Sequence, residues 1–596
     1  MHPTKYYNNR ISSLENDLEQ ALKKDKLIGW GRLISSLSIL PAVYFLWSAG
    51  WLYWLPIALI LLIVFIRFVI ADANNKEQVS HLQYLLVINQ QEIKAQTGDY
   101  FHYDAGNRFT PHDHVYANDI DLFGRASIFQ YINRTTSEMG SSTLANWLLQ
   151  PASVEQILQR QQSINELAGN TPWRQNLQAY GKAKKIESNT QQRLNSWLTE
   201  ATIFVNFKPW AIVRYVLPVI IITVMLLNAV DILPNIVRTI FLLLFGTLAW
   251  FISKRVSVVQ QQLTKIVDEV IVLRRSIQLI ETSHFKTTFL QQLQQPFLIK
   301  QVKASAELKK LQRILDQMDL RYNPLIFIPL NIFLLWDLQQ ILALEKWKIR
   351  NRQNIIQWLD ALGQLEAISS LSTLYFNNPK WCMPTLQPAH FSITGQQIGH
   401  PLINEAKRVN NFINMDAAGE LMLITGSNMA GKSTYLRSIG TNVVLTMAGS
   451  AVCAKSFSLA PVQLITSMRI ADNLEENTST FYAELKKLKT VIEKVNKSEK
   501  IFILLDEILR GTNSLDRHTG SAALIKQLIK KQACGIIATH DVELAKLKEL
   551  YPANILNYYF DVQVSNDELY FDYKLKEGIC NSLNASILMR KIGIEV

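Results

Sequence analysis

Residues 421–440 read LMLITGSNMAGKSTYLRSIG, and this stretch decides the fold of the C-terminal part of the chain. A short apolar run bounded by turn residues is typical of a buried strand. The loop after it fits the pattern G-x-x-x-x-G-K-S/T through Gly426, Gly431, Lys432 and Ser433. Such a loop turns its backbone N–H groups around phosphates, and the following helix directs its positive end at the anion. The stretch therefore predicts a nucleotide-binding α/β domain.

Side chains of this loop have separate expected roles. Lys432 is expected to reach the β- and γ-phosphates, and Ser433 to ligate Mg²⁺. Asn428 and Thr434 lie in the same segment and complete its candidate cofactor-binding residues. The predicted cofactors are therefore ATP and Mg²⁺.

Two further apolar runs end in residues suited to the same chemistry. The run at 500–516, KIFILLDEILRGTNSLD, predicts a strand that ends in Asp506, a second Mg²⁺ ligand, and Glu507, an acid placed to activate water. The run at 534–541, CGIIATHD, ends near His540, which can sense or orient the γ-phosphate. Each motif alone has an ordinary explanation, as a helix cap or a polar strand end. Together they predict one site, because nucleotide sites in open parallel sheets lie at the carboxyl ends of strands.

A helix between these motifs indicates how the site is completed. Residues 477–489 read NTSTFYAELKKLK, and Ser479 stands just before an amphipathic helical pattern. In ATPases of the ABC class, a serine-bearing helix N-terminus of this kind meets the nucleotide held by a second subunit. We therefore expect Ser479 to contact nucleotide and the catalytic unit to be a homodimer that encloses two ATP molecules.

The N-terminal half contains two long apolar segments. Residues 33–66 include no Asp, Glu, Lys or Arg. One membrane-spanning helix needs about 20 apolar residues, with about 17 as a lower limit, so this segment predicts two short spans that fold back near residues 48–50. A second pair, 214–230 and 238–255, lies nearer the lower limit. It is either a second membrane hairpin or two core helices of a helical domain.

Charged flanks predict the orientation of these hairpins. Basic residues precede and follow both pairs: Lys23, Lys24, Lys26, Arg32 and Arg67 for the first, and Lys208, Arg214, Lys254 and Arg255 for the second. The excess of positive charge on the cytoplasmic side places both hairpin tips outside and the rest in the cytoplasm. The predicted location is the cytoplasmic (inner) membrane, as a multi-pass protein with its ATPase domain facing the cytoplasm. A third apolar run, 324–336, is too short to span and contains Pro329, so it predicts a packed helix or one that rests against the bilayer.

Composition leaves two classes of partner open. The 596-residue chain carries a net charge of +12, which suits a nucleic acid or an anionic membrane surface. Its charged fraction is 18%, against about 25% in ordinary soluble proteins. The four cysteines are far apart, which favours a reduced cytoplasmic compartment.

The motifs together resemble the ATPase domain of the MutS family. The resemblance rests on 426–440, on ITSMRIADNLEENTSTFYAEL, LLDEILRGTNSLD and IIATHDVEL, and on HPLIN, VNNF and the C-terminal YKLKEGICNSLNASILMRKIGI. That family's loop usually reads G-P-N-M-G-G-K-S-T, and its acid strand leads into D-E-I-G-R-G-T. Ser427, Ala430 and Leu509 depart from these patterns at positions that are not phosphate ligands. The resemblance therefore implies a working ATPase.

Upstream segments extend the resemblance to the family's helical parts. Residues 122–167 resemble the start of its helical core, and 355–381 resemble the long lever that ends before the ATPase domain. In all, roughly 118–200 and 256–596 are covered. The family's aromatic wedge for mismatched DNA is not recognisable in 1–117, nor is the C-terminal dimer extension. An apolar hairpin stands where the DNA clamp would be inserted, so parts that touch DNA are expected to be replaced by parts that touch membrane.

The expected fold class is an α/β ABC-type P-loop ATPase domain joined to an all-α helical core and lever, with two transmembrane hairpins in the N-terminal half. The predicted order is a cytoplasmic helix (1–30), hairpin 1 (31–70), a linker (71–117), the first part of the core (118–209), hairpin 2 (210–253), lever and second core part (254–380) and the ATPase domain (381–596). One hypothesis is a membrane-anchored, dimeric MutS-related ATPase of the mismatch-repair type, with DNA as a candidate ligand. The alternative is a membrane-embedded motor that acts on the bilayer or on an unidentified protein partner without recognising mismatches.

Overall fold

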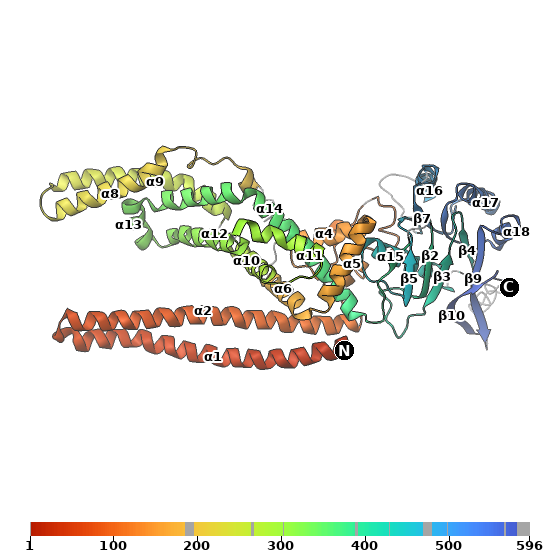
Figure 1. Ribbon diagram of the computed structural model, residues 1–596, viewed down its shortest axis with the longest axis horizontal. Helices are drawn as coiled ribbons and strands as arrows, with labels where there is room; N and C mark the ends of the chain where they lie inside the picture. The colour runs from red at the N-terminus through yellow and green to blue at the C-terminus, as the bar shows by residue number, and fades with distance from the viewer. Residues whose placement is uncertain are drawn as a thin grey trace.

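The computed structural model describes residues 2–111, 113–184, 196–263, 267–301, 303–387, 391–427, 430–468, 480–497, 499–565 and 568–580. Figure 1 shows an elongated molecule, with an α/β head at one end of the long axis and long helices reaching the other end. Within the described residues, the predicted division into a helical part and an α/β part is confirmed.

The head is built on a six-stranded sheet in the order β10-β9-β4-β8-β7-β6. The central strands are parallel and wholly buried, as expected of apolar strands covered on both faces. The strands of this sheet are β4 (Leu421–Thr425), β6 (Gln463–Ser467), β7 (Ile501–Asp506), β8 (Cys534–Ala538), β9 (Ile555–Ser565) and β10 (Glu568–Glu577). The helices of the head are α15 (Lys432–Ala448), α16 (Thr480–Asn496), α17 (Ser514–Lys530), η7 (Val542–Lys546) and α18 (Leu547–Leu550). A smaller sheet, in the order β1-β5-β2-β3, comprises β1 (Thr385–Leu386), β2 (Ile393–Ile398), β3 (Asn411–Met415) and β5 (Ser456–Leu459).

The helical core lies between the head and the second hairpin, and the first hairpin runs alongside it (Figure 1). Its longest helix, α14 (Trp336–Asn377), has 42 residues and extends about 63 Å, and it contains most of the segment 355–381 that resembles the end of the lever. The other core elements are η2 (Asn107–Phe109), α3 (Ile128–Ile132), α4 (Glu138–Leu149), α5 (Val154–Ala168), α6 (Thr171–Ala183), α10 (Val267–Glu281), α11 (Thr288–Gln294), η4 (Gln295–Gln301), α12 (Ala304–Met318), η5 (Asp319–Tyr322) and α13 (Pro324–Leu334).

The first hairpin is longer than predicted. Helix α1 (Pro3–Leu46) and helix α2 (Trp51–Gln96) are each continuous, and they join through η1 (Trp47–Ala49) and Gly50. Gly50 has a φ of 99°, which glycine adopts without steric cost, so the turn lies where the sequence predicts it. The segment predicted as a linker, 71–117, is helical as far as Gln96.

The part of this hairpin outside its apolar segment packs as a two-helix stalk. Helix α1 buries a residue at every seventh position of this part, at Tyr7, Leu14, Ala21 and Ile28, and the spacing continues to Ser35 in the apolar segment. Residues at this spacing lie on one face of the helix, as along the seam of a coiled coil, and this face packs along α2. Helix α2 also packs against α6 of the core.

The second hairpin consists of α8 (Pro209–Ala229) and α9 (Asn235–Leu263). Four helices in the described residues, α1, α2, α8 and α9, are long and apolar enough to cross a membrane by length and composition, and the bent pair α13–α14 would be a fifth. The tips of both hairpins point to the same end of the long axis, away from the head (Figure 1).

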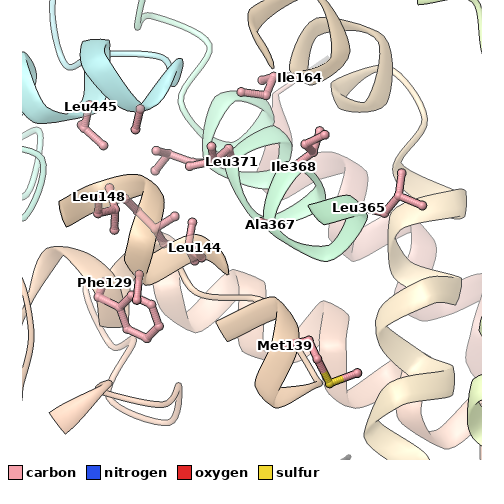
Figure 2. Close-up of a cluster of buried hydrophobic side chains, with 14 of the residues drawn as sticks. Phe129, Met139, Leu144, Leu148, Ile164, Leu365, Ala367, Ile368, Leu371 and Leu445 are labelled. Atoms are coloured by element: carbon pink, nitrogen blue, oxygen red, sulfur yellow. The ribbon is translucent and has the colours of Figure 1, made fainter. Parts of the chain in front are cut away.

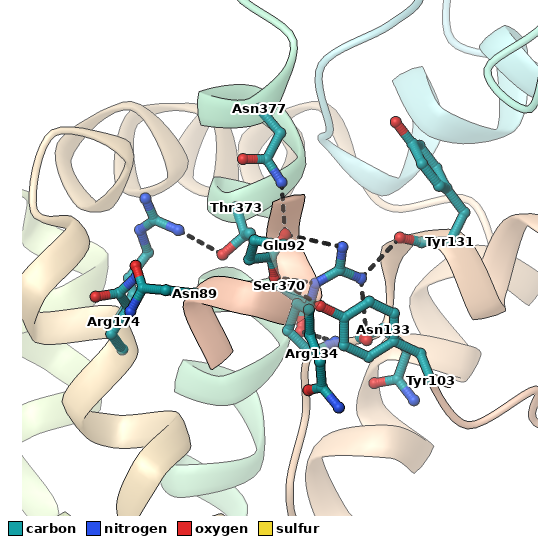
Figure 3. A network of polar contacts seen from close by, with 12 residues as sticks. Asn89, Glu92, Tyr103, Tyr131, Asn133, Arg134, Arg174, Ser370, Thr373 and Asn377 are labelled. Atoms are coloured by element: carbon teal, nitrogen blue, oxygen red, sulfur yellow. Dashed lines mark hydrogen bonds and ion pairs between the residues drawn. The ribbon is translucent and has the colours of Figure 1, made fainter. Parts of the chain in front are cut away.

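A buried polar network joins the base of the first hairpin to the core (Figure 3). The guanidinium of Arg134 forms a bidentate ion pair with Glu92 of α2, with N–O distances of 2.5 and 3.2 Å. Tyr103 and Asn377, the last residue of α14, donate hydrogen bonds to the same carboxylate at 2.9 and 2.7 Å. The Tyr7 hydroxyl of α1 donates to the side chain of Asn377 at 2.7 Å. Both helices of the stalk are therefore fixed where the long helix ends.

Candidate nucleotide site

The two glycines of the loop after β4 have the backbone conformations that a phosphate-binding loop requires. Gly426 has a φ of 140°, and a Cβ there would lie 2.7 Å from the carbonyl oxygen of Phe560. Gly431 has a φ of 105° and immediately precedes α15, whose first residue is Lys432. Both glycines are required, one by close approach and both by a left-handed conformation. The N-terminus of α15 therefore opens onto the loop as the sequence predicts.

Lys432 is buried inside this loop. Its ammonium group donates hydrogen bonds to the carbonyl oxygens of Gly426 at 2.6 Å and Ser427 at 3.1 Å, and it lies 3.3 Å from a ring nitrogen of His540. Burial lowers the pKa of Lys432 to about 8, although Asp506 and Glu507 act in the opposite direction. A buried ammonium beside this loop is suited to bind an anionic phosphate.

Ser433 and Asp506 meet at the start of α15 and the end of β7. The Ser433 hydroxyl donates a hydrogen bond to the carboxylate of Asp506 at 2.5 Å. Two adjacent oxygen ligands beside a phosphate loop suit Mg²⁺, which is usually held by one or two protein oxygens together with substrate phosphates. These residues would hold the metal, as predicted from the sequence.

Glu507 and His540 lie together at the carboxyl ends of β7 and β8. One carboxylate oxygen of Glu507 is 2.6 Å from the His540 Nε2 atom, and the other is 2.9 Å from the Nε atom of Arg510. The hydrogen bond with His540 is the largest influence on the pKa of Glu507, and the pKa is lowered despite partial burial. The carboxylate is therefore ionised near neutral pH and can accept a proton.

Two residues of this site were not predicted from the sequence. Arg510 contacts Glu507, as described, and its guanidinium lies 3.9 Å from Asp506. Glu484, in the first turns of α16, accepts hydrogen bonds from the backbone N–H groups of Leu509 and Arg510 at 2.5 and 3.1 Å. Arg510 follows Glu507 by three residues, and this spacing could have predicted their contact. The contacts of Glu484 join segments that are distant in the sequence, so no local spacing predicts them.

The remaining predicted residues are placed as follows. Thr434 is exposed in the first turn of α15. Asn428 and Ser479 lie outside the described residues, so their predicted contacts stay predictions. Beside Glu507, a cavity of about 330 Å³ is lined in part by Arg510, Arg517 and His518.

Leu509 occupies a backbone conformation that normally favours glycine. Its φ is 60°, in the left-handed region, which costs a residue with a side chain about 1–2 kcal/mol. The side chain fits because Gly520 of α17 faces it: a Cβ on Gly520 would lie 2.6 Å from the Leu509 Cδ1 atom. The departure from glycine at 509 is thus accommodated by a glycine on the neighbouring helix.

The far end of α15 is attached to the helical core. The Ala152 N–H donates to the carbonyl of Met447 at 3.0 Å, and Arg160 of α5 donates to the carbonyl of Ala448 at 3.1 Å. Figure 2 shows Leu445 of α15 beside Leu144 and Leu148 of α4 and the long helix α14. One rigid helix therefore connects the phosphate loop to the core.

Comparison with known proteins matches these two parts separately. A family model described as MutS domain V matches residues 422–590, and one described as MutS domain III matches residues 114–323. The second match runs through the hairpin α8–α9, between the two upstream segments in which the sequence alone suggested a resemblance.

Individual relatives cover less of the chain. The MutS protein homolog 4 of Mus musculus is 35% identical over 196 residues, which are 31% of this chain and 20% of that protein. The DNA mismatch repair protein MutS of Methanococcoides burtonii is 31% identical over 241 residues, 39% of this chain and 27% of its own length. The MutS of Thermotoga neapolitana is 29% identical over 273 residues, 43% and 33% of the two chains. This chain thus spans at most a third of each of these relatives. The two domain matches together include more than half of its residues, and the chain belongs to the MutS family.

Proposed function

We propose that this chain is an ATP-hydrolysing conformational switch that works as a homodimer and is anchored in a membrane by its two apolar hairpins. The observation that carries the ATPase proposal is the convergence of Lys432, Ser433, Asp506, Glu507 and His540 at one edge of the parallel sheet. They come from three separate motifs, and their closeness supports a role in phosphoryl transfer.

Each side chain has a definite task in this proposal. Lys432 balances the charge of the β- and γ-phosphates, while Ser433 and Asp506 hold Mg²⁺, which supplies charge neutralisation when it is bound. Glu507 orients water and takes its proton. His540 hydrogen-bonds Glu507 and keeps its carboxylate ionised and directed toward the end of β8.

Membrane anchoring is supported by the exposure of the apolar hairpins. Many large apolar side chains along them are more than half exposed, which is unusual for a protein surrounded by water. Examples are Leu40, Tyr44, Leu52, Ile212, Val219, Leu243 and Trp250. Helix α2 continues about 30 residues beyond Arg67 to Gln96, so its stalk would hold the head about 45 Å from the bilayer.

The contacts of the core suggest how the two functions are coupled. Helix α15 starts at the phosphate loop and packs on α4 and α5, which pack on α14. Helix α14 in turn contacts α8, α9 and α13 near the second hairpin. In the proposal, ATP-dependent closure of two heads rotates α15 and moves α14 lengthwise, and the second hairpin follows. The first hairpin is coupled separately, through the network around Glu92 and Arg134.

A second candidate function is action on DNA. It is favoured by the relatives named as DNA mismatch repair proteins and by the net charge of +12. The membrane-anchored switch and action on DNA are compatible if a membrane-bound dimer also binds a DNA duplex. They differ in whether the far end of α14 acts on the membrane or on DNA.

The proposal is tested with the full chain reconstituted in lipid nanodiscs. ATP hydrolysis that is lost in Lys432→Ala would support the ATPase proposal. In a separate experiment on membranes that contain the protein, extraction by detergent but not by alkaline carbonate would support the anchoring. Binding to homoduplex and mismatched duplex is then measured across a range of salt concentrations. If the protein binds DNA through its phosphates, the affinity should fall steeply as the salt concentration rises. A higher affinity for the mismatched duplex than for the homoduplex would favour a repair role. ATPase activity without salt-sensitive DNA binding would favour the membrane motor.

A further inference from the structure

We propose that α13 (Pro324–Leu334) is a membrane-surface helix that lies within the cytoplasmic leaflet, across the end of the second hairpin. This inference rests on the proposed membrane anchoring and specifies which lipid region a further element of the core would contact. The partner is the bilayer itself: acyl chains against the helix and lipid phosphates against the cations beside it.

The outward face of α13 is apolar and uncovered. Residues 324–335 include no charged side chain. Leu325 is 88% exposed, Ile328 54% and Ile326 46%, while the opposite side packs on α8, α9 and α14. The helix has 11 residues, too few to cross a bilayer, so contact with one leaflet is the arrangement that would cover this face.

The direction of α13 fits the plane of a membrane. The chain bends by 80° between α13 and α14, at Leu335, whose φ is 48°. Figure 1 shows α13 lying across the long axis, whereas α8, α9 and α14 run along it. If the hairpins cross the bilayer, α13 must therefore lie nearly parallel to its surface.

Hydrogen bonds fix α13 at the level where the second hairpin would leave the bilayer. The side-chain amide of Asn331 donates to the Ser253 hydroxyl at 3.0 Å, and its oxygen accepts from the Asp337 N–H at 3.1 Å. The Ser253 hydroxyl also hydrogen-bonds the carboxylate of Asp337. Ser253 ends the apolar run of α9, and Lys254 follows it directly.

A belt of cation–aromatic pairs surrounds the same level. The guanidinium of Arg321 lies 5.4 Å from the ring centroid of Phe327, and it donates to the carbonyl of Ser253 at 3.0 Å. Arg321 is itself largely buried and lies 3.5 Å from the carboxylate of Asp337, so it positions α13, and the exposed Lys254 and Arg255 are the cations that would meet lipid phosphates. The carbonyl of Arg214 accepts from Gln339 near the start of α14 at 2.7 Å. Three more pairs belong to the belt: Arg214 with Tyr215, Lys254 with Trp250, and Arg255 with Phe251. Aromatic rings and long basic side chains are typical of the membrane–water interface, so the belt marks the level of the lipid headgroups.

The test is fluorescence depth measurement on the full chain in nanodiscs. Leu325→Cys is labelled with the environment-sensitive dye NBD, in a background where the half-exposed Cys382 and Cys580 are replaced by Ser. Leu243→Cys and Ile349→Cys are matched controls, because both sites are exposed apolar positions on helices. Leu243 lies ten residues before Ser253, about 15 Å deeper, and Ile349 lies on α14 on the far side of the belt.

The inference predicts a distinct quenching pattern at each site. Lipids with a doxyl quencher at carbon 5, near the headgroups, should quench the label at 325 more strongly than lipids quenched at carbon 12, and the order should reverse at 243. The label at 349 should be quenched by neither. An unquenched label at 325 beside a quenched label at 243 would overturn the inference and leave anchoring intact. Unquenched labels at both sites would overturn the anchoring as well. Emission at 325 that shifts on dilution of the protein, without lipid quenching, would assign the face to a second copy and also overturn it.

Discussion

Replacing Arg134 by Met is expected to undock the base of the first hairpin from the helical core. Arg134 and Glu92 are both buried, and their bidentate ion pair joins α2 to the segment before α4. Without the guanidinium, the carboxylate of Glu92 keeps the neutral donors Tyr103 and Asn377. Removing one partner of a buried ion pair costs about 3–5 kcal/mol, because the other charge stays buried without compensation.

Amide hydrogen exchange measures this loss locally, which matters because a chain with several units does not unfold in one step. The segments to follow are the end of α2 and the segment that contains Arg134. Since about 1.4 kcal/mol corresponds to a factor of ten, exchange there should accelerate by about two to nearly four orders of magnitude. Arg125→Met is the matched control: the exposed guanidinium of Arg125 lies 4.8 Å from the Phe101 ring centroid, a contact worth about 0.5–1 kcal/mol.

A double variant separates the ion pair from general disruption. Glu92→Gln with Arg134→Met removes both charges of the ion pair, so protection should recover partly relative to Arg134→Met alone. The reasoning is refuted if Arg134→Met exchanges no faster than Arg125→Met, or if the double variant loses the full sum of the two single losses.

Four further predictions concern the head and the stalk. Lys432→Ala should lose nucleotide binding in titrations with a fluorescent ATP analogue; retained affinity would contradict its role in the cradle. Glu507→Gln should keep ATP bound while single-turnover hydrolysis falls about 10²–10⁴-fold, and undiminished turnover would mean that another group is the base. Gly520→Ala should leave hydrolysis nearly unchanged, because the new Cβ meets only the Leu509 Cδ1 atom, the far end of a half-buried side chain that can rotate away; a large loss of rate that adding Leu509→Gly restores would contradict this. Burial opposes ionisation of Glu92, but Arg134 and the hydrogen bonds lower the pKa of its carboxyl group. The stability that ionised Glu92 gives to the docked hairpin is therefore complete above the unfolded pKa of about 4.3, and it is lost as the pH falls through the lowered pKa. Undocking at neutral pH in exchange experiments would contradict this.

Most residues of the site could be predicted because they lie in short sequence motifs, each at the end of an apolar strand. A glycine loop after an apolar strand, and acids or a histidine at the ends of two others, place Lys432, Asp506 and His540 together once the strands are parallel. The contacts of Glu484 with residues 509 and 510 were not predictable in this way. They join a helix to a loop about 25 residues later, and no local spacing reports such a contact.

The extent of the first hairpin was missed for a different reason. The prediction of a linker at 71–117 followed the end of the strongly apolar run, whereas α2 continues in a polar sequence to Gln96. The heptad of buried residues in α1, from Tyr7 to Ser35, was an available signal for a paired stalk. Its docking through Glu92 and Asn377, 285 positions apart, could be found only in three dimensions.

The central claim is that ATP bound between the two heads of the dimer moves the membrane-anchored helices of the second hairpin. Spin labels at Ile236→Cys, an exposed site near the tip of the second hairpin, measure the distance between the two protomers of the dimer in nanodiscs. In the Glu507→Gln background, ATP and Mg²⁺ should produce a new distance population that Lys432→Ala does not show. The same distance distribution with and without ATP would contradict the account.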